Sequence, residues 1–321
     1  MKIIYWRRIT QIIFFILIIY GGFLIAQAFS IEKEIIAKGT EDEINLLDIS
    51  LPIRTCRYIE PKPTLFESCG LRYLLNRPIY RNIWIPVVLF ILIILAFCFV
   101  FGRFMCGWMC PLGFVSDILD YSRKKLKINR ITFNNPVKKI LKYWRYSFLI
   151  FLFFMSVAII LPFLAGIYMS KNFSDLACQV CPARTIIPLF GLKIPTFPTF
   201  LTPLTAIFST ISLIFLGIYL TGVIITRPWC TICPNGSFTS LFNKGCLITK
   251  EKDIQKCTKC GICKRVCPFT NTEVFEEKTK KNVDLSNCIN CFNCVDKCPE
   301  DDCLKVKFLG KTVFKSKFRD K

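Results

Sequence analysis

Two cysteine runs near the C-terminus constrain this chain more than any other feature. Each run spaces three cysteines two residues apart and adds a fourth three residues later, directly before proline: Cys257, Cys260, Cys263 and Cys267, then Cys288, Cys291, Cys294 and Cys298. Three closely spaced thiolates wrap one face of a [4Fe–4S] cube, and where two such runs occur the fourth ligand is exchanged between them. The spacing therefore predicts one cluster on Cys257, Cys260, Cys263 and Cys298, and a second on Cys288, Cys291, Cys294 and Cys267.

Other uses of these cysteines fit the pattern poorly. Structural zinc sites use C-x2-C pairs and need no third and fourth cysteine ending in proline. Disulfides require suitable Cα separations, which three cysteines two residues apart cannot all find. The chain of 321 residues contains no histidine, which excludes bis-histidine haem, C-x-x-C-H haem attachment, Rieske ligation and histidine-bound zinc or copper. The sequence therefore predicts iron–sulfur chemistry and no haem.

Four apolar stretches precede the cysteine runs, at residues 9–29, 83–101, 147–167 and 200–225. A helix needs about 20 apolar residues to cross a hydrocarbon core of about 30 Å. Residues 1–243 are therefore predicted to form an all-α four-helix transmembrane bundle of two two-helix repeats, with outer loops at 30–82 and 168–199. Residues 244–321 are predicted to form a small α+β module of the bacterial two-cluster ferredoxin type, with a basic tail.

The distribution of charge predicts the orientation of this bundle. The net charge of +21 is concentrated in residues 102–145 and 226–321, whereas residues 30–82 have no net charge. Because Lys and Arg stay on the cytoplasmic side, both termini are expected in the cytoplasm, in a multi-pass protein of a prokaryotic inner membrane in contact with lipid. These basic segments and the cluster thiolates account for the charge, so nucleic-acid binding is not expected.

The second and fourth apolar stretches end in similar tails, residues 102–114 and 226–238. The tails carry Cys106, Cys110, Cys230 and Cys233, and each second cysteine is followed by proline. A cluster held between the two repeats would need this arrangement, so the four cysteines are a candidate third iron–sulfur site. The alternative is that each pair only shapes the chain as it leaves a helix, with reduced thiols in a reducing cytoplasm.

Four more cysteines fall in the predicted outer loops: Cys56, Cys69, Cys178 and Cys181. In an oxidising compartment disulfides are the expected state. A metal or redox site is the alternative, because Cys178-x2-Cys181-Pro182 has the form that lowers a thiol pKa. Cys98, Cys246 and Cys303 are interpreted as small buried hydrophobic residues.

Together these motifs resemble the NapH-type membrane polyferredoxins, whose membrane half is shared with NosR and CcoG. Cys106-x3-Cys110-Pro111 matches the family's C-x3-C-P motif, whereas Cys230-x2-Cys233-Pro234 is one residue shorter. The resemblance implies a quinol dehydrogenase or electron-transfer subunit, with quinone or quinol as substrate and the other subunits of a redox complex as partners.

The leading hypothesis is electron transfer between the membrane quinone pool and the redox partners of a respiratory complex. The alternatives are a factor that supplies reductant for the maturation of a metalloenzyme, a membrane thiol/disulfide conduit, or a structural anchor for a soluble dehydrogenase. The outer cysteines distinguish the leading hypothesis from the supply of reductant to a maturing metalloenzyme, because an outward electron path would require these cysteines to cycle between thiol and disulfide.

Overall fold

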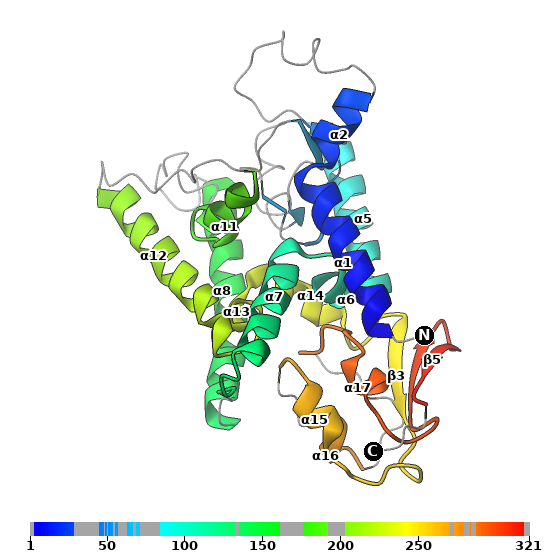
Figure 1. Ribbon diagram of the computed structural model, residues 1–321. Coiled ribbons are helices and arrows are strands. Elements are labelled where there is room, and N and C mark those ends of the chain that lie inside the picture. The colour runs from blue at the N-terminus through cyan, green and yellow to red at the C-terminus, as the bar shows by residue number, and fades with distance from the viewer. Residues whose placement is uncertain are drawn as a thin grey trace.

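The computed structural model describes residues 3–28, 45–47, 49, 51–53, 55–56, 63–66, 69–70, 84–131, 135–160, 176–191, 203–269, 273–278, 283 and 287–317. Figure 1 shows long helices above a smaller part that contains a three-stranded sheet. The long helical segments are α1 (Ile3–Ile19), α2 (Gly21–Ala28), α5 (Trp84–Phe101), α8 (Asn135–Ile160) and α12 (Pro203–Leu220). Most of the two predicted outer loops lies outside the described residues.

The prediction of a four-helix transmembrane bundle is wrong for the residues that the structure describes. No single helix among them is both long enough and apolar enough to cross a membrane. Helices α1 and α2 are long and apolar enough only when taken together, and they are bent by 66° relative to each other. Two apolar stretches are shorter than the roughly 20 residues required: Ile91–Phe101 within α5, and Ser209–Val223, which begins in α12 and runs three residues past its end. In α8 the first turns are polar and carry Lys138, Lys139 and Lys142.

The break between α1 and α2 has a packing reason. A Cβ atom on Gly22 would lie 2.1 Å from the carbonyl oxygen of Pro63, so the chain leading into β2 (Thr64–Phe66) packs directly on the helix backbone. Strand β2 pairs in parallel with β1 (Asn45–Leu47). Part of the segment predicted as an outer loop therefore folds against the helices.

The internal repeat predicted from the two cysteine tails is visible as a repeated order of helices. In the first copy, α5 leads to the short helix α6 (Phe104–Trp108) and then to α7 (Pro111–Lys125). In the second, α12 leads through the 3₁₀ turn η2 (Thr221–Val223) to the short helix α13 (Pro228–Ile232) and then to α14 (Pro234–Phe242). Cys110 and Cys233 each stand in an extended conformation directly before a proline at the first helical position, where proline's fixed φ favours helix initiation.

Between the repeats, the described chain includes the short helices α10 (Leu176–Gln179) and α11 (Ala183–Phe190). Buried side chains of α11, with Val180 and Cys181 before it, join those of the repeat helices in one hydrophobic core, which contains Ile187, Phe215, Tyr219 and Trp229. The repeats are thus packed together by a shared core.

The C-terminal module is built on an antiparallel sheet in the order β3 (Ile248–Lys252), β4 (Leu304–Phe308) and β5 (Lys311–Lys315). Leu309 and Gly310 join β4 to β5 with φ values of 50° and 78°, as a two-residue type I′ turn requires. The short helices α15 (Ile262–Val266), α16 (Glu273–Glu276) and α17 (Asn293–Asp296) complete the module. The predicted basic tail therefore contains two strands of the sheet.

Candidate iron–sulfur sites

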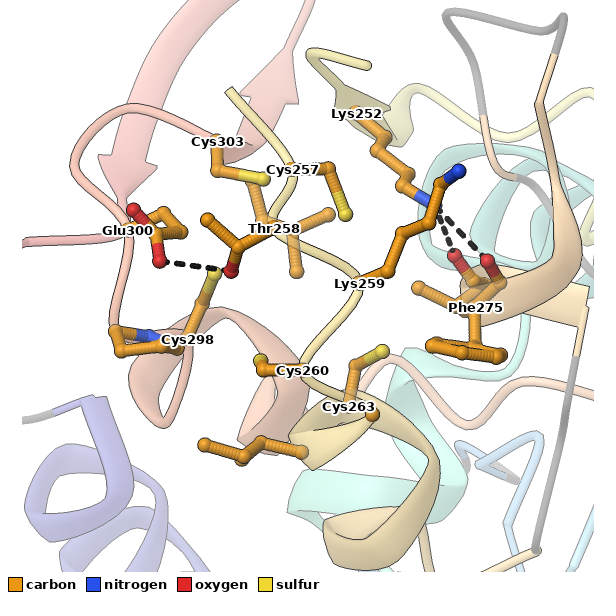
Figure 2. A pocket seen from close by; sticks show the side chains of 15 residues that line it. Lys252, Cys257, Thr258, Lys259, Cys260, Cys263, Phe275, Cys298, Glu300 and Cys303 are labelled. Atoms are coloured by element: carbon orange, nitrogen blue, oxygen red, sulfur yellow. Dashed lines mark hydrogen bonds between the residues drawn. The ribbon is translucent and has the colours of Figure 1, made fainter. Parts of the chain in front are cut away.

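The structure brings together the four cysteines predicted to hold the first cluster. Cys257, Cys260, Cys263 and Cys298 line one pocket with an empty volume of about 370 Å³, and Cys303 lines it as well. Figure 2 shows that these cysteines reach the pocket from two separate segments of the chain. The exchange of the fourth ligand between runs is therefore compatible with this fold, and the assignment of ligands stays a prediction.

Cys303, interpreted from the sequence as a buried hydrophobic residue, has a more specific position. Its side chain lies beside that of Cys298 at the pocket, and its interaction with Cys298 lowers the pKa of the Cys298 thiol. A thiolate is the form that binds iron, so this contact favours the protonation state that a cluster ligand needs.

The cysteines predicted to hold the second cluster also lie close together, around Cys294. Burial raises the pKa of Cys294 well above its usual value, Lys250 opposes the rise, and the neighbouring Cys288, Cys291 and Cys267 add to it. Lys250 itself is only 3% exposed and donates hydrogen bonds to Cys288 Sγ at 2.7 Å and to Asn290 Oδ1 at 2.7 Å. A cation in contact with a half-buried sulfur stabilises negative charge on that sulfur.

The four cysteines of the repeat tails line a third cavity. Cys106, Cys110, Cys230 and Cys233 surround an empty volume of about 360 Å³. Ile53 also lines it, although the sequence placed this residue in an outer loop. The cavity thus lies where the two repeats meet.

Two arginines hold the halves of this cavity together in a reciprocal way. Arg103 and Arg227 each precede the first cysteine of a tail by three residues, and both side chains are fully buried. Arg103 donates to the backbone oxygen of Cys230 at 3.1 Å, and Arg227 donates to that of Cys106 at 3.4 Å. Each repeat therefore supplies a guanidinium to the cysteine helix of the other.

The glycines that follow the Cys-Pro pairs make room for these arginines. A Cβ atom on Gly236 would lie 3.0 Å from an Arg103 nitrogen, and one on Gly113 would lie 3.4 Å from an Arg227 nitrogen and 2.7 Å from the Cys106 oxygen. Matched glycines at matched positions confirm that the tails are two copies of one structural unit.

The two arginines differ in how their charge is balanced. Arg227 forms a salt bridge with Asp117 at 2.7 Å, and Asp117 also pairs with Arg7. Arg103 has no carboxylate partner in the described chain, and its buried Nε atom has no hydrogen-bond partner there. The Nε1 atom of Trp229, another residue that lines the cavity, also lacks one. An unpaired buried cation and an orphaned buried donor are costly, so the cavity suits an anion that accepts hydrogen bonds.

These three cysteine groups fit iron–sulfur clusters by the chemistry of their donors. Across the described residues no three His, Cys, Asp or Glu side chains are gathered so that they could hold a single metal ion. A cubane centre instead takes four separate thiolates around a larger body. All three groups offer four cysteines, and two of them line cavities of similar size.

Comparison with known proteins supports the same chemistry. A protein-family profile described as a 4Fe-4S binding domain matches twice, at residues 83–129 and 207–252, and each match contains one cysteine tail. A second profile, described as a 4Fe-4S dicluster domain, matches residues 249–299. The internal repeat is thereby confirmed, as are iron–sulfur binding domains in both parts of the chain.

Two relatives of the same kind give the family resemblance. The ferredoxin-type protein NapH of Haemophilus influenzae is 26% identical over 306 residues, which cover 93% of this chain and 88% of the relative. NapH of Escherichia coli is 25% identical over 205 residues, covering 62% of this chain and 60% of the relative. The chain is a NapH-like polyferredoxin. It is therefore a ferredoxin-type electron-transfer protein.

An uncharacterized protein of Methanocaldococcus jannaschii is also similar to this NapH-like chain, with 29% identity over 215 residues that cover 66% of this chain and 75% of the relative. No solved structure matches the chain.

The four cysteines of the predicted outer loops are mostly buried. Cys56, Cys69 and Cys181 are 8%, 2% and 4% exposed, and Cys178 is half-buried. Cys56 and Cys181 belong to the same hydrophobic core as Cys110 and Cys233 of the tails. Cys69 packs in a separate small cluster with Leu152. Whether they form disulfides or a redox site stays a prediction.

Sequence reasoning missed the basic residues around these sites. Lys250 and Lys252 alternate on the buried face of β3 and reach the second and first cysteine groups, respectively. Arg103 and Arg227 could have been found, because Arg-x2-Cys occurs at the same place in both tails. Lys250 had no comparable signal, because the strand that buries it is formed with β4, more than fifty residues later in the chain.

Proposed function

We propose that this chain passes single electrons between the quinone pool and redox partners through three [4Fe–4S] centres. Two centres would be held by the exchanged cysteine sets of the C-terminal module, and the third by Cys106, Cys110, Cys230 and Cys233. The cofactors supply the electron chemistry, and the protein fixes their spacing and electrostatic surroundings. The observation that carries the proposal is the cavity between the repeats, with its four cysteines and an arginine that has no carboxylate partner in the described chain.

Iron content tests the number of centres. Anaerobically purified protein with three cubane centres should contain about twelve irons per chain, four for each centre. The variant Cys233→Ala should lose about four of these irons. Cys246→Ala is the matched control and should keep all of them, since Cys246 lies outside all three cysteine groups and its thiol donates to backbone oxygens of Asn243 and Ile248. About eight irons in the unaltered protein would contradict the third centre.

Quinol reduction tests the substrate. A menadiol analogue added to the oxidised protein should bleach the cluster absorbance and produce the EPR signal of reduced cubane centres. Each quinol would release two electrons and two protons, so two centres are reduced for each quinol consumed. If neither quinols nor quinones change the redox state of any centre, the quinone pool is removed from the proposal.

We also propose that the chain works in contact with lipid. Large apolar side chains are exposed along α5, α8 and α12, among them Leu92, Phe153, Phe154 and Ile214, at 56%, 62%, 65% and 56%. Exposed apolar surface of this extent is typical of membrane or partner contacts. Flotation with liposomes of neutral phospholipid tests it, and a chain that stays with the soluble fraction without detergent would contradict it.

A second candidate function is the supply of reductant to a partner that is being matured. It is favoured by the packing of Cys56 and Cys181 into the same core as Cys110 and Cys233, because a disulfide in that core could accept two electrons and two protons and become two thiols. Differential alkylation of cells grown with and without electron donor tests this. Cys56, Cys69, Cys178 and Cys181 should change their oxidation state with donor supply, and cysteines that remain unchanged would contradict it.

A further inference from the structure

The two parts of the chain touch at the backbone between two of the cysteine groups. Gly107 directly follows Cys106, and Ile289 directly follows Cys288. A Cβ atom on Gly107 would lie 2.4 Å from the carbonyl oxygen of Ile289. Because real Cβ atoms do not approach an oxygen so closely, only glycine permits this contact. It places the chain around Cys106 directly against the chain around Cys288.

Side chains on both sides of the glycine fix this contact. Trp108 Nε1 donates to the backbone oxygen of Asn290 at 2.9 Å. Arg7 donates to the oxygen of Gly107 at 3.1 Å and to Asn293 Oδ1 at 3.3 Å, so α1 is bonded to both parts. The ring of Trp108 also packs near Phe292, with 6.0 Å between centroids.

A chain of buried charges also connects the two parts. Arg227 donates to the backbone oxygen of Cys106 at 3.4 Å and forms a salt bridge with Asp117 at 2.7 Å. Asp117 also pairs with Arg7, which bonds Asn293 of the module. The chain therefore runs from the cysteine helix of the first repeat to α17.

The other cysteine group of the module faces away from this contact. Figure 1 shows α17 between α6 and the pair α15 and α16. Around the run that starts at Cys257, the exposed residues include Lys256, Thr258, Lys259, Lys264 and Arg265. The run that starts at Cys288 is more enclosed, with Ile289, Asn290, Cys291 and Phe292 all buried. The Cys257 group is thus the one that a soluble protein can approach.

We propose that electrons pass through the three centres in a fixed spatial order, and this inference rests on the proposed third centre. The centre of the repeat cavity exchanges electrons with the Cys288, Cys291, Cys294 and Cys267 centre across the contact of Gly107 with Ile289. That centre exchanges with the Cys257, Cys260, Cys263 and Cys298 centre, which exchanges with a soluble one-electron carrier. In each step one centre is oxidised by one electron and its neighbour is reduced by one, with no bond made or broken.

Spin coupling in the fully reduced protein tests this order, with Gly107→Val as the main variant. Two reduced centres that are neighbours split or broaden each other's EPR signals, so the repeat-cavity centre should show this interaction in the unaltered protein. The variant keeps every proposed ligand but cannot keep the contact, so we expect the interaction to be lost while the iron content stays near that of the unaltered protein. Gly245→Ala is the matched control, because a Cβ atom there meets nothing within 4 Å, and the interaction should be unchanged.

Removal of single centres gives an independent measurement. Cys291→Ala should abolish the interaction of the repeat-cavity centre, whereas Cys260→Ala should leave it intact. The reverse pattern, or an interaction that survives in Gly107→Val, would overturn the proposed order. The third centre itself would be contradicted by a different result: about eight irons in the unaltered protein, none of which is lost in Cys233→Ala. The experiments therefore distinguish a wrong order of electron transfer from the absence of the third centre.

Discussion

Lys250 offers a direct test of how the protein sets the reduction potential of a proposed centre. Its ammonium group lies 2.7 Å from Cys288 Sγ and is almost completely buried. We expect Lys250→Met to make the centre of the Cys288 group harder to reduce, because an added electron would lose a neighbouring positive charge. Methionine keeps much of the apolar volume of the lysine side chain, so packing changes little.

The size of the effect follows from Coulomb's law. An electron spread over a cluster lies roughly 6 Å from the lysine nitrogen, and with an effective dielectric constant of about 20 their attraction is roughly 3 kcal/mol. Since about 1.4 kcal/mol corresponds to 59 mV for one electron, the reduction potential should fall by roughly 120 mV.

The assay is a redox titration followed by EPR, and β3 supplies its own control. Lys252 is also buried, but it donates to the backbone oxygens of Val274, Phe275 and Glu277 at 2.9, 3.2 and 3.1 Å and lines the pocket of the Cys257 group. Lys252→Met should therefore leave the potential of the Cys288 centre unchanged. An unchanged or higher potential in Lys250→Met, with all iron retained, would refute the reasoning.

Three further predictions concern the buried charges and the contact between the two parts. Asp117 is buried against Arg227 and Arg7, whose positive charges outweigh the effect of burial and hold its pKa at about 2. Asp117→Asn should therefore lower the free energy of unfolding at pH 7 by about 3 kcal/mol, as measured by chemical denaturation. A variant as stable as the unaltered protein would contradict the contribution of these salt bridges. Because the folded pKa lies below the unfolded value near 4, this difference should be complete above pH 4 and shrink as the pH falls towards 2, and a difference that grows there would exclude Asp117 as its source. Trp108→Phe removes the hydrogen bond to Asn290 and should destabilise the docking of the module by about 1 kcal/mol, seen as faster amide hydrogen exchange in α17. Arg103→Gln should lower the potential of the repeat-cavity centre without changing the Cys257 centre, and a shift of both centres would contradict a local role.

The sequence predicted the cysteine groups because their spacing is set by local geometry. Three thiolates on a short loop reach one cube whatever surrounds them, so the runs from Cys257 and Cys288 indicated their chemistry without a fold. The duplicated tails could also be predicted from the sequence, since the proline after Cys110 and the proline after Cys233 each start a helix. The four apolar stretches were expected to be transmembrane helices, which is wrong for the described residues, although each stretch contains helical residues.

The extent of the helices was not predictable in the same way. Hydropathy measures composition along a segment, but a helix ends where the backbone must make other contacts. The helix at the N-terminus breaks before Gly21 and Gly22, where the segment around Pro63 packs against the backbone. The basic C-terminal tail was predicted only from its charge, and its alternation of lysines with apolar residues forms β4 and β5 because β3 is available as a partner.

The amino-acid sequence alone predicts which thiolates would bind iron in the proposed sites, because thiolate spacing is a short-range property of the chain. Only the tertiary structure decided which groups are neighbours: that Arg103 reaches Cys230 from the other repeat, that Lys250 touches Cys288, and that Gly107 meets Ile289. These pairs are separated by 127, 38 and 182 positions. Their contacts depend on how two hydrophobic cores pack against each other, and packing of that kind leaves no local pattern in a sequence.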